Sequence, residues 1–378
     1  MDRCIRLLRD LVAIDSVNPS LVPGAAGEAA AAGAIADHMR RLGLDVEVQD
    51  AAPGRPNVVG VLDGRAGGRS LMFCGHIDTV GVEGMTRPFD PREDEGRLYG
   101  RGAQDMKGGL AAMIDATRVL AERGFGRGRL LVAAVVDEEY ASLGADALVR
   151  TWRADAAVVT EPTDLQIGIG HKGFAWVKVQ TRGVAAHGSR PRDGRDAIIR
   201  MGRVLQQLES LDRELQARPP HPVMGTASLH ASIISGGREL SSYPDRCDLE
   251  MERRTVAGES ERDALFEVQT ILDGLRAADP EFDASAVLSF SRPPYELPAG
   301  HELPRTLAAS AAAAGTDSTS VGMSFWTDAA ILAGAGIPSV LFGPGGAGLH
   351  SAEEYVRIAD VMACRDVLVR LAEAWCAT

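Results

Sequence analysis

Apolar positions follow two different periods along this chain, and the change between them separates predicted helices from predicted strands. A spacing of three and four residues predicts amphipathic helices over 2–14 and 27–43. Short apolar runs bounded by Gly and Pro predict strands at 44–49, 57–62 and 70–75. Helices and strands therefore alternate, which indicates an α/β protein.

The most apolar run, Leu130–Val136, ends at three consecutive acids. Seven apolar residues in a row predict a strand that is buried on both faces, as in parallel sheets. Asp137, Glu138 and Glu139 then stand at the carboxyl end of this strand, where open α/β sheets bind ligands. A solvated acidic turn is one interpretation of these acids. The other is a functional site, in which a cation lies between the carboxylates or one of them has a raised pKa.

The predicted strand at 70–75 leads into His76 and Asp78. Residues two apart in an extended segment point to the same side, so one can ligate a metal while the other accepts the second N–H of the imidazole. A surface His–Asp pair is the alternative. Asp105 follows a glycine-rich lead-in and stands just before a helix predicted from Met106 to Leu120. Its alternative role is to cap that helix.

Two further strand ends carry similar side chains. Glu161 stands at the end of the apolar segment DAAVVTEP, and His350 follows a predicted strand at 338–342 and a glycine loop. His350 is expected just before a C-terminal helix. The alternative interpretation is a polar capping loop with Ser351 as the cap and Glu354 at its third position.

The metal-capable side chains thus gather at four strand ends and one helix start. They are His76, Asp78, Asp105, Glu138, Glu139, Glu161 and His350. The set has two imidazoles and several carboxylates but no thiolate. This mixture favours zinc, cobalt or manganese in a hydrolytic site over a structural zinc site.

Composition narrows the class of protein. A length of 378 residues suggests two domains, and 40 basic against 52 acidic residues leave a net charge of −12. That charge disfavours a nucleic-acid partner or an anionic membrane surface. We expect neither a membrane span nor a signal peptide. The cysteines show no pairing pattern, which predicts reduced thiols and a cytoplasmic protein; they are Cys4, Cys74, Cys247, Cys364 and Cys376.

The segments GHIDTV, GRGAQDMKGG, VVDEE, TEP and GLHSAEEYV together carry a resemblance to a known family. In order and approximate spacing they resemble the co-catalytic zinc hydrolases, which include acetylornithine deacetylase, succinyl-diaminopimelate desuccinylase, aminoacylase and glutamate carboxypeptidase. The resemblance covers nearly the whole chain. It implies a hydrolase domain with a mixed, mostly parallel sheet flanked by helices, and an inserted ferredoxin-like domain that makes a homodimer.

The same resemblance implies a role for each metal-capable residue. One divalent ion, with zinc expected first and cobalt or manganese as alternatives, would be held by His76, Asp105 and Glu161. A second ion would be held by His350, Asp105 and Glu139, so that Asp105 bridges the two. Glu138 would be the general base, and Asp78 would orient His76 from behind.

Between residues 174 and 292 the pattern changes to β-α-β-β-α-β, which is ferredoxin-like order. It predicts a domain inserted into a catalytic domain made of residues 1–173 and 293–378, and the resemblance implies that the insert is a dimerisation or lid domain. These motif-bearing outer segments and the insert would then have separate tasks.

Two residues of the insert match family residues, and a third departs from one. His187 matches a histidine that reaches across the dimer to stabilise the oxyanion; a solvated loop histidine is the alternative. Arg254 matches an arginine that binds the substrate carboxylate, and its alternative is an ion pair with Glu252 or Asp248. Ser241 stands where relatives often carry Asn, which puts that substrate contact in doubt.

The sequence therefore predicts a metal-dependent amidohydrolase that removes an acyl group from an N-acyl amino acid or a similar small amide. A carboxypeptidase or dipeptidase of the same family is the alternative enzyme. A catalytically silent binding protein is a further alternative, although such a protein has no use for Glu138.

Overall fold

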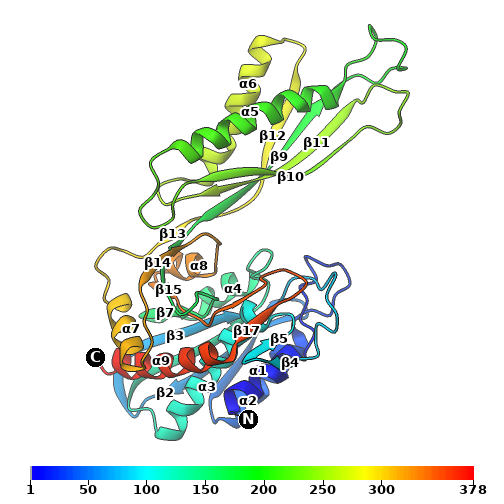
Figure 1. The fold of residues 1–378 in the computed structure, drawn as a ribbon. Coiled ribbons are helices and arrows are strands. Elements are labelled where there is room, and N and C mark those ends of the chain that lie inside the picture. Colours follow the sequence, from blue (N-terminus) through cyan, green and yellow to red (C-terminus); the bar gives the residue numbers. More distant parts are fainter. Residues whose placement is uncertain (1) are drawn as a thin grey trace. The chain divides into compact units, whose positions relative to one another are not determined.

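The chain folds into two units, one of which is made largely from a single internal segment. The computed structural model describes residues 2–378 (Figure 1). Unit 1 comprises Met1–Ile169, Leu297–Val321 and Thr327–Thr378, and unit 2 comprises Gly170–Glu296 and Gly322–Trp326. The segment 174–292, which the sequence marks as an insert, lies inside unit 2.

Unit 1 is built on a mixed sheet. Along it the strands follow the order β1 (Asp45–Ala52), β2 (Arg55–Asp63), β6 (Arg127–Val135), β3 (Ala66–His76), β7 (Ala156–Val159), β15 (Ser339–Leu341) and β8 (Ile167–His171). The central strands are parallel, because β3 runs parallel to β6 and β7, and β15 runs parallel to β7. Their carboxyl ends therefore meet at one edge of the sheet. β1, β2 and β8 are antiparallel to their neighbours, and β14 (Ser320–Met323) pairs with β8.

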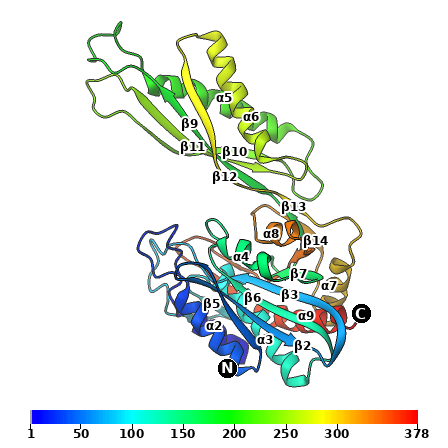
Figure 2. The same ribbon diagram turned by 180° about the vertical axis from the view of Figure 1, so that it is seen from behind.

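Helices cover both faces of this sheet (Figures 1 and 2). On one face lie α1 (Arg3–Val12), α3 (Gly108–Arg123), α7 (Glu302–Ala313) and α9 (Ile358–Cys376). The helix α2 (Ala29–Arg41) lies on this same face, since Met39 packs against Gly60 of β2 on the side where Leu110 of α3 packs against Gly75 of β3. On the other face lie α4 (Leu143–Thr151) and α8 (Ala329–Gly334). The apolar residues at 71–74 and 130–135 are almost completely buried between these layers. The predicted mixed sheet flanked by helices is confirmed.

A small antiparallel sheet joins segments that lie far apart in the sequence. It has the order β16 (Gly346–Ala347), β17 (Tyr355–Arg357), β5 (Arg97–Tyr99) and β4 (Arg92–Asp94). Because β17 pairs with β5, the loop that carries His350 is anchored beside the segment that leads to Asp105.

Unit 2 has the predicted ferredoxin-like order. Its elements are β9 (Gly173–Arg182), α5 (Ala197–Ala217), β10 (Ser228–Gly236), β11 (Arg246–Thr255), α6 (Glu261–Ala278) and β12 (Asp283–Arg292). The sheet order is β10-β11-β9-β12, and the three neighbouring pairs of strands are antiparallel. Figure 1 shows α5 and α6 on one face, where they share an apolar core with Val177, Leu249 and Met251. β13 (Tyr295–Glu296) pairs with Gly170 and His171 at the end of β8.

The local structure differs from the sequence prediction at two helix starts. The helix expected from Met106 begins at Gly108, after the π-helical turn η1 (Ala103–Lys107), and Asp105 does not have helical φ and ψ angles. The last helix begins at Ile358 with Arg357 at its N-cap. The interpretation of Ser351 as its cap is therefore wrong, because the small sheet separates the His350 loop from the helix.

Two other findings concern the whole described chain. No helix within residues 2–378 is long and apolar enough to cross a membrane. All five cysteines are free thiols with buried side chains.

Candidate metal centre

The metal-capable residues come together where the parallel strands of unit 1 end. His76 is the last residue of β3, the acids 137–139 follow β6, and Glu161 follows β7. His350 lies in the loop after β15, between β16 and β17. Neighbouring parallel strands present their carboxyl ends at the same edge, so residues far apart in sequence become neighbours.

Asp105 lies between the two imidazoles. Its Oδ1 is 3.0 Å from His76 Nε2, and its Oδ2 is 3.4 Å from His350 Nε2. His350 Nε2 is also 3.2 Å from an oxygen of Glu139, and His76 Nε2 is 3.9 Å from an oxygen of Glu161. The side chain of Asp105 therefore contacts both histidines rather than capping α3.

These contacts form one continuous cluster. In the described chain, the ligand atoms of His76, Asp105 and Glu139 lie within 4.8 Å of one another, as do those of His76, Glu138 and Glu161. These two groups cut across the ligand sets implied by the family resemblance, because all the side chains share one small volume. Distances alone do not divide the cluster into two ions or separate Glu138 from the ligands.

The charges of the cluster suit divalent cations. Burial, and then the charge of Glu161, raises the pKa of Glu138 well above its usual range. Burial and the charge of Asp105 raise the pKa of Glu139 to about 6. One oxygen of Glu139 and one of Glu161 have no hydrogen-bond partner in the structure. Unpaired buried carboxylate oxygens facing imidazole nitrogens are the ligands that zinc, cobalt and manganese accept, so the residues fit such ions.

His350 differs from His76 in exposure. Its side chain is 54% exposed, whereas that of His76 is 1% exposed. Hydrogen bonds to Asp105 and Glu139 raise the pKa of His350 to about 10. The carboxylates of the cluster therefore stabilise a positive charge on its exposed side, at His350.

Asp78 holds the backbone of two neighbouring acids. Its Oδ1 accepts a hydrogen bond from the amide of Glu138 and its Oδ2 from the amide of Glu139, both at 3.1 Å. His76 Nδ1 lies 3.0 Å from the backbone carbonyl of Asp78 and 3.6 Å from its Oδ1. Because a carbonyl and a carboxylate only accept, Nδ1 donates to Asp78 and Nε2 donates to Asp105. Burial alone would lower the pKa of His76, but the hydrogen bonds to Asp105 and Asp78 outweigh burial and raise this pKa well above its usual range.

A buried polar network behind Asp78 was missed in the sequence analysis. Asn18 donates to Asp78 Oδ2 at 2.8 Å and to Asp137 Oδ1 at 3.1 Å. Arg55 pairs with Asp137 at 2.7 Å and with the fully buried Glu28. The only signal of this network was a pair of short polar segments, SVNPS and RPN, interrupting apolar patterns.

The sequence analysis also missed an acid near the cluster, Asp328. Asp328, which is 1% exposed, precedes α8, and its charge raises the pKa of both Glu138 and Glu161. It stands after a Trp-Thr pair and not directly after a predicted strand, so the strand-end argument did not reach it.

The other three candidate residues belong to unit 2. His187 is exposed, its Nδ1 lies 2.8 Å from Ser189 Oγ, and it borders a cavity of about 420 Å³. Ser241 is exposed in a neighbouring loop, and its carbonyl accepts a hydrogen bond from Gly188 at 2.7 Å. Arg254 donates to Glu252 at 2.6 Å, the ion pair weighed as its alternative role. The structure thus brings the His187 and Ser241 loops together within unit 2.

Comparisons with known proteins agree with this arrangement of residues. Residues 72–374 match the model of peptidase family M20/M25/M40. The chain is a member of this family. It is therefore an M20 metallohydrolase, and the family resemblance seen in the sequence motifs is confirmed.

Proteins similar to this chain are named for different hydrolytic activities. The chain is 32% identical to an acetylornithine deacetylase of Myxococcus xanthus, over 98% of this chain and 96% of that one. It is 29% identical to an N-formyl-4-amino-5-aminomethyl-2-methylpyrimidine deformylase of Bacillus subtilis, covering 90% and 88% of the two chains. A tripeptidase from Staphylococcus aureus shares the fold with a TM-score of 0.84 at 22% identity, covering 100% and 98%.

Proposed function

We propose that this M20 metallohydrolase removes the acyl group from N-acyl amino acids or related small amides. The observation that carries the proposal is the cluster of His76, Asp105, Glu139, Glu161 and His350 with Glu138 beside it. The named relatives that cleave N-acetyl and N-formyl groups support this substrate class.

The five residues other than Glu138 would hold two divalent ions, zinc before cobalt or manganese, with Asp105 between them. Two such ions would supply Lewis-acid polarisation of the scissile carbonyl and lower the pKa of the attacking water. This pairing also accounts for the unpartnered oxygens of Glu139 and Glu161.

Glu138 is proposed as the general base. Its carboxylate takes the proton of the attacking water and passes it to the leaving nitrogen, so that the amine departs neutral. The raised pKa of Glu138 suits a group that must hold a proton between these two steps. Asp78 orients both Glu138 and Glu139 through their amides, so base and ligand keep a fixed relative position.

Unit 2 is proposed to supply recognition and assembly. We infer a homodimer in which His187 donates a hydrogen bond to the oxyanion formed in the partner's site. Arg254 and Ser241 are proposed to bind the carboxylate or side chain of the substrate. The support is the resemblance of the sequence around these residues to family motifs, the membership of the chain in the M20 family, and the exposed edge strand β10.

A substrate panel on the metal-loaded enzyme tests the proposal. N-acetyl, N-formyl and N-succinyl amino acids should be cleaved, with stoichiometric release of free amine, faster than dipeptides and tripeptides. Hydrolysis of peptides alone would instead assign the chain to the peptidases of its family. Binding of acyl amino acids without any turnover would support a silent binding protein.

A further inference from the structure

Glu354 is a buried carboxylate outside the proposed set of metal ligands. Its side chain is 1% exposed and pairs with Arg101, which is 3% exposed, at 2.7 Å. Its Oε2 also accepts from the amide of Gly102 at 3.1 Å. Its Oε1 accepts from the amides of Gln104 at 2.9 Å and Asp105 at 3.1 Å. All these donors lose a partner if the carboxylate is replaced, which makes such a buried group costly to remove.

Arg101 extends these contacts to the loop of His350. Its Nη2 donates to the carbonyl of Ser351 at 3.0 Å, and its Nε donates to the carbonyl of Gly81 at 3.0 Å. Ser351 directly follows His350 in sequence. The ion pair therefore joins the segment that carries Asp105 to the segment that carries His350, although 250 residues separate Arg101 from Ser351.

Both of these segments have unusual backbone conformations. Asp105 has φ −118° and ψ 95° inside a π-helical turn, and His350 has a left-handed φ of 58°. A non-glycine residue stays in the left-handed region only when its surroundings hold it there. The hydrogen bonds of Glu354 and Arg101 act on the amide of Asp105 and on the carbonyl that follows His350.

We propose that the Arg101–Glu354 ion pair is a positioning element that sets how Asp105 and His350 face each other. This inference rests on the proposed function, because it takes these two residues as metal ligands. An ion bound through His350 would depend on the Arg101–Glu354 pair through both of its ligands His350 and Asp105. The other ion would be held by His76 and Glu161 at strand ends and would depend on the Arg101–Glu354 pair only through Asp105. Loss of the ion pair should therefore weaken the two ions unequally.

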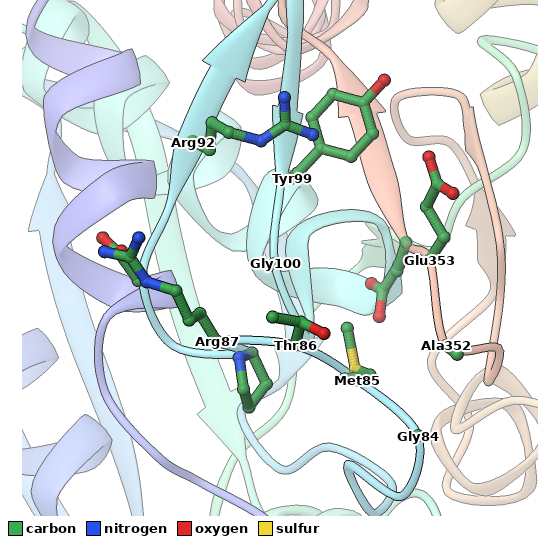
Figure 3. A pocket seen from close by; sticks show the side chains of 12 residues that line it. Gly84, Met85, Thr86, Arg87, Arg92, Tyr99, Gly100, Ala352 and Glu353 are labelled. Carbon is green, nitrogen blue, oxygen red and sulfur yellow. The ribbon is translucent and has the colours of Figure 1, made fainter.

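A matched control lies next in the sequence. Residues 352–354 and the loop 84–88 line a cavity of about 380 Å³, where Figure 3 shows the side chain of Glu353. Glu353 is exposed, whereas its neighbour Glu354 is buried. Glu353→Gln removes the same formal charge from the same loop and leaves every hydrogen bond of Glu354 in place.

The experiment is calorimetric titration of the metal-free protein with Zn²⁺, with total metal measured after dialysis. Single variants His76→Ala and His350→Ala assign the two binding steps. In Glu354→Gln the step assigned to His350 should weaken about 10- to 100-fold, as for other groups that orient metal ligands, and the other step by less than about threefold. Glu353→Gln should leave both steps unchanged.

The outcomes separate this inference from the proposed function. A wild-type protein that does not bind two Zn²⁺ ions overturns both the inference and the proposed function. A wild-type protein with two ions, combined with equal weakening of both steps or no weakening in Glu354→Gln, overturns the positioning role alone. If Glu354→Gln does not fold, Arg101→Lys decides. It keeps the charge, but its single nitrogen cannot occupy the three positions from which Nε, Nη1 and Nη2 of Arg101 donate to Gly81, Glu354 and Ser351. It must show the same unequal loss.

Discussion

The two units of this protein differ in where they place their candidate functional residues. Unit 1 buries carboxylates and imidazoles at the carboxyl ends of parallel strands, including Asp78, Asp137 and Glu161. Unit 2 buries an apolar core under two helices and carries His187 and Ser241 on exposed loops. Burying charge is costly unless partners or a cation offset it, whereas exposed loop residues cost almost nothing to place. The difference agrees with the proposed division of tasks, in which unit 1 performs the chemistry and unit 2 recognises the substrate and forms the dimer.

The largest expected effect follows from the shared ligand in unit 1. Asp105→Ala should remove both ions, because its two oxygens face both imidazoles, and activity should be lost with them. His76→Ala and His350→Ala should each mainly cost one ion. Metal content after dialysis measures this, and two tightly held ions in Asp105→Ala would refute the bridging role.

The next effect separates the base from its neighbour. Glu138→Gln should keep about two ions per chain while kcat falls about 100-fold or more, the loss typical of a general base. Glu139→Gln should lower metal occupancy instead. Steady-state kinetics with metal analysis on the same samples checks both, and a Glu138→Gln enzyme within a few-fold of wild type would end the assignment.

A comparable effect is expected from one exposed residue of unit 2. His187→Ala should lower kcat about 100- to 1000-fold with full metal content, if its imidazole donates to the oxyanion. Mixing it with inactive Glu138→Ala tests the origin of the donor, since a hybrid dimer contains one complete site. Recovered activity after subunit exchange supports a donor from the partner; absence of recovery despite proven hybrids contradicts it.

A smaller effect concerns pH and the stability of unit 2. Burial lowers the pKa of His171 from 6.5 to about 4, so the folded state holds this imidazole neutral. Because the unfolded chain binds the proton more readily, stability should be complete above pH 6.5 and fall as pH decreases toward 4. The loss amounts to at most about 3 kcal/mol. Urea unfolding monitored with a probe in unit 2 should show this decrease of the free energy of unfolding with pH for wild type. His171→Gln should not show it.

The smallest expected effect concerns assembly. Ile233 and Ile234 on the edge strand β10 are 62% and 52% exposed. If β10 forms the homodimer contact, Ile233→Lys should raise the dimer dissociation constant about tenfold or more. Val48→Lys on the edge strand β1 of unit 1 is the matched control. Sedimentation equilibrium that shows equal effects of both changes would exclude β10 as the interface.

The strand ends of unit 1 could be predicted because apolar runs and the acids that follow them are local signals. Residues such as His76 and Glu161 needed no knowledge of the tertiary structure. The partners that hold the site could not be predicted in this way, because their contacts join distant segments. Arg101 meets Glu354 across 253 residues, and Asn18 meets Asp78 across 60. Only the folded chain reveals such pairs.

The register of β9 has a consequence for how the insert affects the chain. Phe174 near the start of β9 is the cross-strand partner of Arg292 at the end of β12. The main points of entry and exit of unit 2 therefore lie about 5 Å apart, the distance between paired Cα atoms. Once unit 2 is folded, its more than a hundred residues constrain the ends of the unit 1 chain as a tight hairpin would. The entropy of folding of unit 1 therefore changes little with the length of the insert. The long insert thus adds a second unit at the entropic cost of a short turn.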